Sequence, residues 1–226
     1  MFQIASITKS FKEKAVLKGV SFSIEEGDKI ALLGNNGAGK STLFNIIAGQ
    51  LQADSGTIKT SLDFQREIGM MPQGDLLIED LTVAELVELK SRMNQLKQAD
   101  INGLLEMVEL RESREQMVGS LSGGQKRRLS LLVTILNHPK LIFLDEPTTG
   151  MDLEAVDNFW KLLERQEFTS VVVTHDFNQI DAFFTKVLIL KDGRIAATKS
   201  VEGIHQAGQT IEQYFREEMN KGGEQA

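Results

Sequence analysis

The chain of 226 residues contains no cysteine. It therefore cannot form disulfides, attack a substrate with a thiol or bind a metal ion through thiolates, and this composition fits the cytosol. Long apolar runs are also missing: the strongest, at 141–144 and 187–190, have the length of a strand rather than the roughly 20 residues of a membrane-spanning helix. The N-terminal segment lacks the continuous apolar core of a signal peptide. We therefore expect a protein that is soluble by itself, with any membrane part of its function on another polypeptide.

An excess of positive charge is missing as well. The chain has 25 basic and 32 acidic residues, and its net charge is -7. Because surfaces that bind nucleic acids are normally built from clustered lysine and arginine, we expect no nucleic-acid partner. A local basic run, Lys126-Arg127-Arg128, lies on a predicted helix. We interpret this run as a solvated face or as a contact with another subunit.

Apolar residues make up 41% of the chain, which is enough for a substantial core in one large domain or two small ones. The N-terminal part is rich in short apolar runs between turn residues, a pattern typical of strands. The predicted strands are 3–8, 20–24, 29–33, 57–60 and 68–71, with turns at 26–28 and 54–56. Residues 74–137 differ, because apolar residues such as Val83, Leu86 and Val87 recur there at helical spacing. They predict an inserted helical lobe.

Strands and helices alternate again after residue 140. We predict strands at 141–144 and 170–174, helices at 152–166, 177–183 and 210–219, and a hairpin around Asp192-Gly193. Such alternation implies a mainly parallel sheet covered by helices. We therefore expect an α/β fold in which 1–73 and 138–226 form the core and 74–137 form the helical lobe of a single domain.

Residues 34–41 read Gly-Asn-Asn-Gly-Ala-Gly-Lys-Ser and match the phosphate-loop pattern between a predicted strand and a predicted helix. Gly37 and Gly39 allow the backbone to turn its N–H groups inward, where they would meet phosphate oxygens at the positive end of a helix dipole. Lys40 would contact the outer phosphates, and the Ser41 hydroxyl would bind Mg²⁺. The residues expected to bind nucleotide here are Gly34, Asn35, Asn36, Gly37, Ala38, Gly39, Lys40, Ser41 and Thr42.

Two acidic residues and a histidine follow buried strands. Asp145 and Glu146 come directly after the apolar run 141–144, at the carboxyl end of a strand, where ligands bind in open parallel sheets. Asp145 would hold the magnesium ion, directly or through water, and Glu146 would orient and deprotonate the attacking water. His175 follows the run 171–174 in the same way and would contact a terminal phosphate and stabilise charge in the transition state.

A second glycine-rich helix start, Leu121-Ser122-Gly123-Gly124-Gln125, makes this more than an ordinary nucleotide pocket. These segments, in this order, resemble the nucleotide-binding subunit of an ATP-binding-cassette (ABC) transporter over nearly the whole chain. In that family the phosphate loop is followed by a glutamine loop, this signature, a strand with two acids, a loop with a further aspartate, and a switch histidine. The matching positions here are Gln73, 121–125, Asp145 with Glu146, Asp152 and His175.

The resemblance implies an ABC ATPase fold, which is a P-loop NTPase core with a mainly parallel sheet, an N-terminal antiparallel β part and the inserted lobe. It implies hydrolysis of ATP with Mg²⁺, with Gln73 as a further magnesium and catalytic residue. Phe11 stands where an aromatic side chain stacks on adenine, although ordinary packing would also suit it. The remaining residues implied to bind nucleotide are Ser122, Gly123, Gly124, Gln125 and Asp152.

The resemblance also implies partners. The signature helix would bind the γ-phosphate of ATP held by an opposite subunit, so a second copy or a paralogous ATPase subunit would close two equivalent sites in a two-fold dimer. Hydrolysis would open that dimer. The Gln73 loop and the lobe would couple this cycle to an integral-membrane permease, which would place the chain at the cytoplasmic face of the cell membrane.

The segments 68–73, 80–83, 126–129 and 148–152 look like those of exporters of drugs, peptides or polysaccharides whose permease is a separate chain. The short tail favours the same branch. Leu153 departs from the family pattern, because proline often follows the aspartate there. An importer subunit and a soluble ABC ATPase of the iron-sulfur assembly type remain as alternatives. A binding module without activity is disfavoured, because Lys40, Asp145, Glu146 and His175 are all present.

Overall fold

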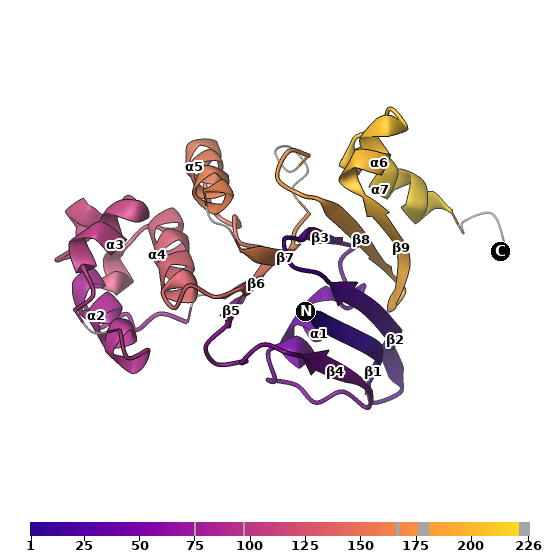
Figure 1. The fold of residues 1–226 in the computed structure, drawn as a ribbon, viewed down its shortest axis with the longest axis horizontal. Coiled ribbons are helices and arrows are strands. Elements are labelled where there is room, and N and C mark those ends of the chain that lie inside the picture. Colours follow the sequence, from indigo (N-terminus) through magenta and orange to yellow (C-terminus); the bar gives the residue numbers. More distant parts are fainter. Residues whose placement is uncertain (75, 97, 166–167, 176–180, 222–226) are drawn as a thin grey trace. The chain divides into compact units, whose positions relative to one another are not determined.

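A computed structural model describes the chain except residues 75, 97, 166–167, 176–180 and 222–226 (Figure 1). The chain forms two compact units. The first unit comprises Met1–Leu62 and Thr169–Ala226, and the second unit comprises Asp63–Phe168. This division follows packing and differs from the predicted lobe at 74–137, since the second unit also holds two strands and a further helix. The division into a core and a helical lobe stays a prediction.

The first unit opens with an antiparallel sheet in the order β2 (Lys14–Ile24), β1 (Phe2–Phe11), β4 (Ser55–Thr60). Phe2, Ile4 and Ile7 of β1 are each about 1% exposed. A bulge between Ile4 and Ile7 shifts the register by one residue, so that Ile7 points to the core in place of Ser6.

The turn predicted at 54–56 is wrong in part, because Ser55 and Gly56 already belong to β4. Gly56 lies beside the bulge with a φ of 97°, and a Cβ atom there would come within 2.5 Å of the Ser6 carbonyl oxygen. The glycine therefore serves a close approach of two strands. In the sequence alone, a glycine at this position is indistinguishable from one in a turn.

The other strands of the first unit pair in the order β7 (Thr169–Val173), β3 (Lys29–Leu33), β8 (Lys186–Lys191), β9 (Arg194–Ser200). β7, β3 and β8 are parallel, whereas β9 returns antiparallel through the predicted hairpin. Asp192 and Gly193 both have positive φ, as a two-residue turn of this kind requires. α1 (Lys40–Ile47) follows β3, and α6 (Val201–Gln206) and α7 (Ile211–Asn220) follow β9. The sequence reading missed α6, which is only six residues long.

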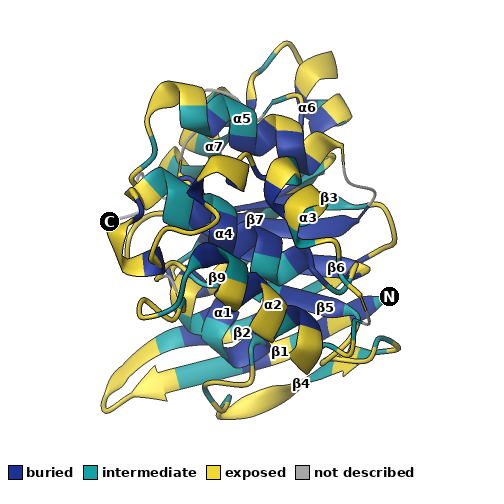
Figure 2. Ribbon diagram, turned by 90° about the vertical axis from the view of Figure 1, so that its left-hand side faces the viewer, coloured by how far each residue is buried: buried dark blue, intermediate teal, exposed yellow. Residues whose placement is uncertain are grey.

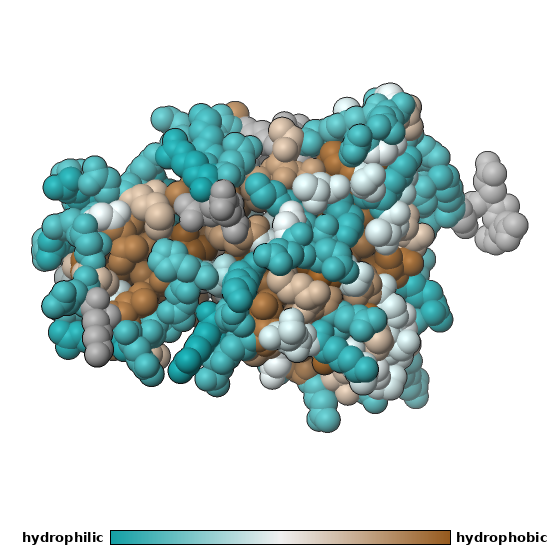
Figure 3. All heavy atoms as spheres, viewed as in Figure 1, coloured by the Kyte–Doolittle hydropathy of each residue, from teal (hydrophilic) through white to brown (hydrophobic). Residues whose placement is uncertain are grey.

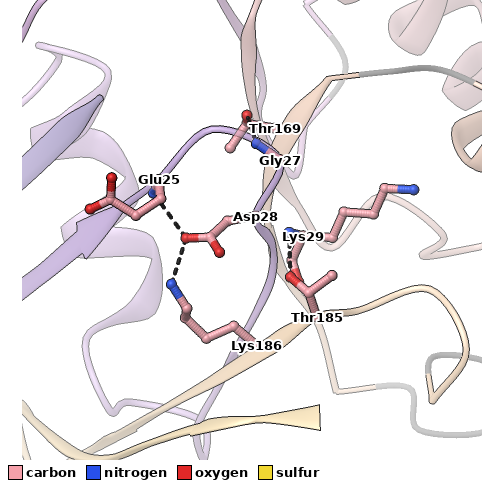
Figure 4. Close-up of polar contacts among 7 residues, drawn as sticks. All are labelled: Glu25, Gly27, Asp28, Lys29, Thr169, Thr185 and Lys186. Atoms are coloured by element: carbon pink, nitrogen blue, oxygen red, sulfur yellow. Dashed lines mark hydrogen bonds and ion pairs between the residues drawn. The ribbon is translucent and has the colours of Figure 1, made fainter. Parts of the chain in front are cut away.

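Polar contacts fasten the amino ends of the parallel strands (Figure 4). The Asp28 carboxylate accepts hydrogen bonds from the Glu25 N–H at 2.9 Å and from Lys186 Nζ at 2.5 Å. The hydroxyl oxygens of Thr169 and Thr185 accept from the N–H groups on either side of Asp28, at 3.0 and 2.9 Å. The turn before β3 is thereby tied to β7 and β8, and the loops at the opposite, carboxyl ends of these strands carry the predicted site.

The second unit contains a parallel pair, β5 (Ile68–Met71) and β6 (Leu141–Asp145). Its helices are α2 (Val83–Met93), α3 (Ile101–Met107), α4 (Gly123–Ile135) and α5 (Leu153–Glu164), with short 3₁₀ turns at Arg111–Ser113 and Val118–Ser120. β6 is buried along its whole length (Figure 2). α4 packs closely on β5, because Gly69 lies so near Thr134 that a Cβ atom would come within 2.8 Å of its carbonyl oxygen.

The predicted strands 29–33 and 68–71 coincide with β3 and β5. The predicted helix at 177–183 falls largely outside the described residues, and 181–183 form a turn. Within the described part of the chain, no helix has the length and apolarity to cross a membrane. The expected α/β class is confirmed, with an antiparallel sheet beside mostly parallel strands and helices.

Candidate functional site

The predicted phosphate loop joins β3 to α1 in the first unit. Gly34 lies against β8, where a Cβ atom would come within 2.4 Å of the Leu190 carbonyl oxygen. Gly39 has a φ of 108°, and a Cβ atom there would come within 2.7 Å of Leu17 Cδ2. Both positions therefore require glycine. Gly39 is also the N-cap residue of α1 and provides no side-chain cap, so the first N–H groups of the helix are available to an anion.

Lys40 is buried, with 8% of its surface exposed, and its ammonium group lies along the inside of the loop. Its Nζ donates to the carbonyl oxygens of Gly34 at 2.6 Å and Asn35 at 3.3 Å. Asn35, Asn36 and Gly37 are exposed at the tip of the loop, whereas Ala38 is buried beneath it. Ser41, exposed, and Thr42, half-buried, stand in the first turn of α1. A nest of N–H groups with a lysine and a hydroxyl beside it fits the phosphates of a nucleotide.

His175 lies at the same edge of the sheet as this loop. β7 is the parallel neighbour of β3, and Val173 is paired with Leu32. His175 and Gly34 each lie two residues beyond that pair, and His175 is exposed. The structure thus brings the predicted histidine and the predicted loop together within the first unit.

Phe11 ends β1 and is 46% exposed. The Nζ atom of Lys9 lies 5.7 Å from the centre of its ring. An exposed ring at a strand end is no part of the core, so packing does not explain this residue. Its role in stacking on adenine stays a prediction.

The predicted acids and the glutamine lie together in the second unit. Asp145 ends β6 and is 4% exposed, and Glu146 follows with a φ of 48°. Gln73 is exposed two residues after the end of β5, whose Met71 is paired with Leu144. The three residues therefore occupy the carboxyl ends of neighbouring parallel strands, as ligand-binding residues do in such sheets.

This donor set suits Mg²⁺. A buried carboxylate is costly unless it is paired or meets a cation, and Mg²⁺ prefers carboxylate, hydroxyl and phosphate oxygens. Nucleotide sites hold Mg²⁺ with one or two protein oxygens and complete the shell with phosphate and water. Correspondingly, no three His, Asp or Glu side chains gather as an all-protein metal site among the described residues. The Asp145 carboxylate would be a ligand of the ion in this unit, and Ser41 and Gln73 as further ligands stay predictions.

The signature segment starts α4 with a capping box. Ser122 is the N-cap, and its Oγ accepts from the Gln125 N–H at 3.3 Å while its own N–H donates to Gln125 Oε1 at 2.9 Å. Gln125 Nε2 also donates to the Ser113 hydroxyl at 3.0 Å. The N–H groups of Gly123 and Gly124 lie between the capped ones in the first turn. The side chain of Gln125 thus holds the loop, and the two glycines carry the N–H groups placed to meet an anion.

Asp152 has a local role that the structure makes plain. Its Oδ1 accepts from the Ala155 N–H at 2.9 Å and caps α5. Leu153 is the first residue of that helix and is 80% exposed. Proline is also favoured at this position, so the departure from the family pattern leaves the helix start intact.

The structure overturns the sequence interpretation of the basic run 126–128 at one residue, Arg127. Lys126 and Arg128 form ion pairs with Glu79 and Glu109. Arg127, by contrast, is 3% exposed and donates to the backbone carbonyl groups of Gln73, Glu146 and Pro147. It is therefore neither a solvated face nor a subunit contact. One signal was available: Arg127 lies four residues before Leu131, on the face of α4 that is buried.

Comparison with known proteins agrees with these observations. A model of the ABC transporter family matches residues 17–149. Nod factor export ATP-binding protein I of Rhizobium sp. (strain N33) is 35% identical over 87% of this chain and 70% of that protein. The uncharacterized ABC transporter ATP-binding protein YxlF of Bacillus subtilis (strain 168) is 34% identical over 93% of this chain and 74% of its own length.

Solved structures show the same likeness. The dimeric post-hydrolysis state of the ATP-binding cassette MJ0796, bound to ADP and Pi, has a TM-score of 0.79 at 29% identity, over 89% of this chain and 99% of that one. An ATP binding subunit of an ABC transporter has a TM-score of 0.86 over 97% of this chain and 99% of that one, and at 23% identity it shows the shared fold. The chain therefore belongs to the ABC transporter family and is an ATP-binding subunit that hydrolyses ATP with Mg²⁺.

Proposed function

We propose that this chain dimerises around ATP and powers export of a drug, peptide or similar molecule through a separate permease. The branch is supported by the relatives named for Nod factor export, which are similar over most of this chain. The direction of transport and the class of transported molecule in this proposal rest on that likeness. The dimer rests on an observation within the chain itself.

That observation is the pair Gly123 and Gly124. A Cβ atom on Gly123 would lie 3.6 Å from the Gly150 carbonyl oxygen, and one on Gly124 would lie 3.7 Å from Ala155 Cβ, both ordinary contacts. Neither residue has a positive φ. Glycine loses more conformational freedom on folding than any other residue, and the described part of the chain gives no steric reason for two of them at this helix start. A group from outside the chain that approaches the helix backbone closely supplies the reason, and a phosphate held by a second subunit fits.

The residues then divide the work of hydrolysis. The nest at 34–41 and the Lys40 ammonium bind the phosphates, and Ser122 with the two glycines would close over the γ-phosphate from the opposite subunit. Glu146 orients the attacking water and takes its proton, while His175 stabilises the charge that develops on the phosphate. Mg²⁺, when bound, supplies neutralisation of phosphate charge at Ser41 and Asp145.

The permease would dock on the second unit. Apolar side chains lie exposed in three segments of this unit. Leu76, after Gln73, is 71% exposed, Met93 at the end of α2 is 65% exposed, and Met117, which pairs with Thr82 before α2, is 44% exposed. Hydrophobic atoms show among hydrophilic ones over the helices at the left of Figure 3. Exposed apolar groups of this kind are typical of protein interfaces. Binding there would place the chain at the cytoplasmic face of the membrane.

The Glu146→Gln variant tests the proposal. It keeps the shape of the side chain but removes its basicity, so we expect ATP binding like that of the wild type, turnover lowered at least a hundredfold, and a dimer that accumulates with ATP. Turnover is measured by phosphate release and the dimer by light scattering. Turnover at the wild-type rate would show that Glu146 is not the base.

The same variant identifies the partner. Captured from membranes in the presence of ATP, it should bring down an integral-membrane protein. The matched control Glu154→Gln, at an exposed position of α5, should bring down no more of that protein than the wild type does. Copurification with soluble assembly proteins instead would favour the non-transport alternative.

A further inference from the structure

Arg127 holds together three backbone segments of the second unit. Its side chain points from α4 to the residues that follow β5 and to those that end β6. The guanidinium has five N–H groups, and five carbonyl oxygens lie within hydrogen-bond distance of it. Nε donates to Pro147 at 3.0 Å, Nη1 to Pro72 at 3.1 Å and Gln73 at 3.0 Å, and Nη2 to Asp145 at 3.3 Å and Glu146 at 2.9 Å.

Only a planar, forked cation can make this set of contacts. Nη1 donates to the loop of Gln73, whereas Nη2 and Nε donate to the loop of Glu146. One planar guanidinium therefore binds both loops. A lysine has three donors on a single nitrogen and cannot reach carbonyl groups on both sides. Burial of a charge is costly, and oriented carbonyl dipoles compensate it here.

The backbone at Glu146 needs such support. Its φ of 48° lies in the left-handed region, which side chains with a Cβ rarely adopt. The next residue is Pro147, and a residue before proline is pushed towards extended conformations. Arg127 donates to the carbonyl groups of both residues and so holds the strained turn that points the Glu146 side chain.

We propose that Arg127 is a positioning residue for hydrolysis, which fixes the backbone of Glu146 and Gln73 to the helix that carries the signature. This inference rests on the proposed role of Glu146. α4 begins at the signature glycines, and Arg127 is one turn further along the same helix. A shift of α4 on contact with the opposite nucleotide would therefore reach both loops through the planar guanidinium of this side chain. The hydrogen bonds that Arg127 donates to carbonyl oxygens of both loops are the contacts through which it acts.

Arg127→Lys in the full chain tests this, with Arg128→Lys as the matched control. Arg128 is the next residue of the same helix and forms an ion pair with Glu109 at 2.6 Å, which a lysine can keep. Displacement of a reacting group by about 1 Å can cost on the order of a hundredfold in rate. We expect Arg127→Lys to lower kcat at least tenfold with KM for ATP changed less than twofold, and Arg128→Lys to change both less than twofold.

A double variant separates positioning from a general loss of structure. If Arg127 acts through Glu146, then Arg127→Lys should lower the turnover of Glu146→Gln less than twofold further. Equal fold-losses in both backgrounds would overturn the inference. If Glu146→Gln by itself turns over like the wild type, the assigned base is wrong, and the next measurement still tests Arg127.

That measurement is amide hydrogen exchange of the nucleotide-free protein, which does not depend on activity. Arg127→Lys should speed exchange in the peptides around 72–74 and 145–149 together, with α2 unchanged, and Arg128→Lys should speed neither. Unchanged exchange in the two loops would refute the inference. A rise throughout the second unit, or a failure of Arg127→Lys to fold, would refute it as well, because Arg127 would then serve stability alone.

Discussion

Arg127 and Lys40 are both cations that the fold buries against carbonyl oxygens. They differ in whether a bound nucleotide would compete for their hydrogen bonds. Arg127 is bound by five carbonyl groups of its own unit, whereas the two described carbonyl contacts of Lys40 come from the phosphate loop itself, at Gly34 and Asn35. The Lys40 ammonium thus preorganises the loop, and a phosphate oxygen would compete with these carbonyl groups for its protons.

Lys40→Ala should weaken ATP binding at least tenfold, because the variant loses both the charge and the contacts that hold the loop. Binding is measured by fluorescence with a labelled nucleotide. Lys140→Ala, at an exposed ion pair with Glu67, is the charge-matched control and should bind ATP as the wild type does. Equal affinity of the two variants would contradict the assignment of Lys40.

Capping boxes start three helices of the described chain, α2, α4 and α7. The box of α2 is the one whose energetics depend on pH. Glu85 accepts from the N–H and the hydroxyl of Thr82, and these hydrogen bonds lower the pKa of its carboxyl group below the usual 4.5. A lowered folded-state pKa means that the contribution is present above pH 4.5 and is lost as the pH falls through the folded-state pKa.

Glu85→Ala should therefore lower the thermal unfolding midpoint at pH 7, and the difference from the wild type should shrink as the pH falls below about 4.5. Circular dichroism melts at several pH values measure this. Glu88→Ala loses only an exposed pair with Arg92 on the same helix and should change the midpoint at pH 7 less. A difference that grew on acidification would show that the box contributes nothing through its carboxylate.

The proposed dimer concerns the whole molecule, and its test follows from the cap of α4. Ser122→Arg puts a bulky cation where the opposite phosphate would approach, so we expect no ATP-induced dimer while the lone chain still binds ATP through its own phosphate loop. The variant also loses the capping hydroxyl, which costs about 1 kcal/mol. Ser122→Ala loses the same hydroxyl but adds neither bulk nor charge, and it keeps the N–H groups of the two glycines, so it should still dimerise. Light scattering with ATP would refute the role of this helix if Ser122→Arg dimerised normally.

The sequence by itself determined the parts of this protein that are local in the chain. Contiguous patterns predict the strands β3 and β5, the presence of α1 after the phosphate loop and the start of α4 at the signature. Apolar periodicity and the order of glycine, lysine and serine specify backbone conformation over a few residues. Family likeness then supplied the chemistry, and the comparisons confirm the family.

Tertiary structure alone decided the roles that depend on distant partners. In the sequence Gly56 resembles a turn residue, but in the fold it lets β1 approach closely. Arg127 resembles a solvated charge in the sequence. Its carbonyl partners lie 54 and 55 residues earlier and 18 to 20 residues later, so only the fold brings them to it. A polar or charged side chain can be buried if its hydrogen bonds are satisfied, and the folded chain supplies the groups that satisfy them. The sequence therefore predicted which residues carry the chemistry, and the fold showed which residue binds the backbone around two of them.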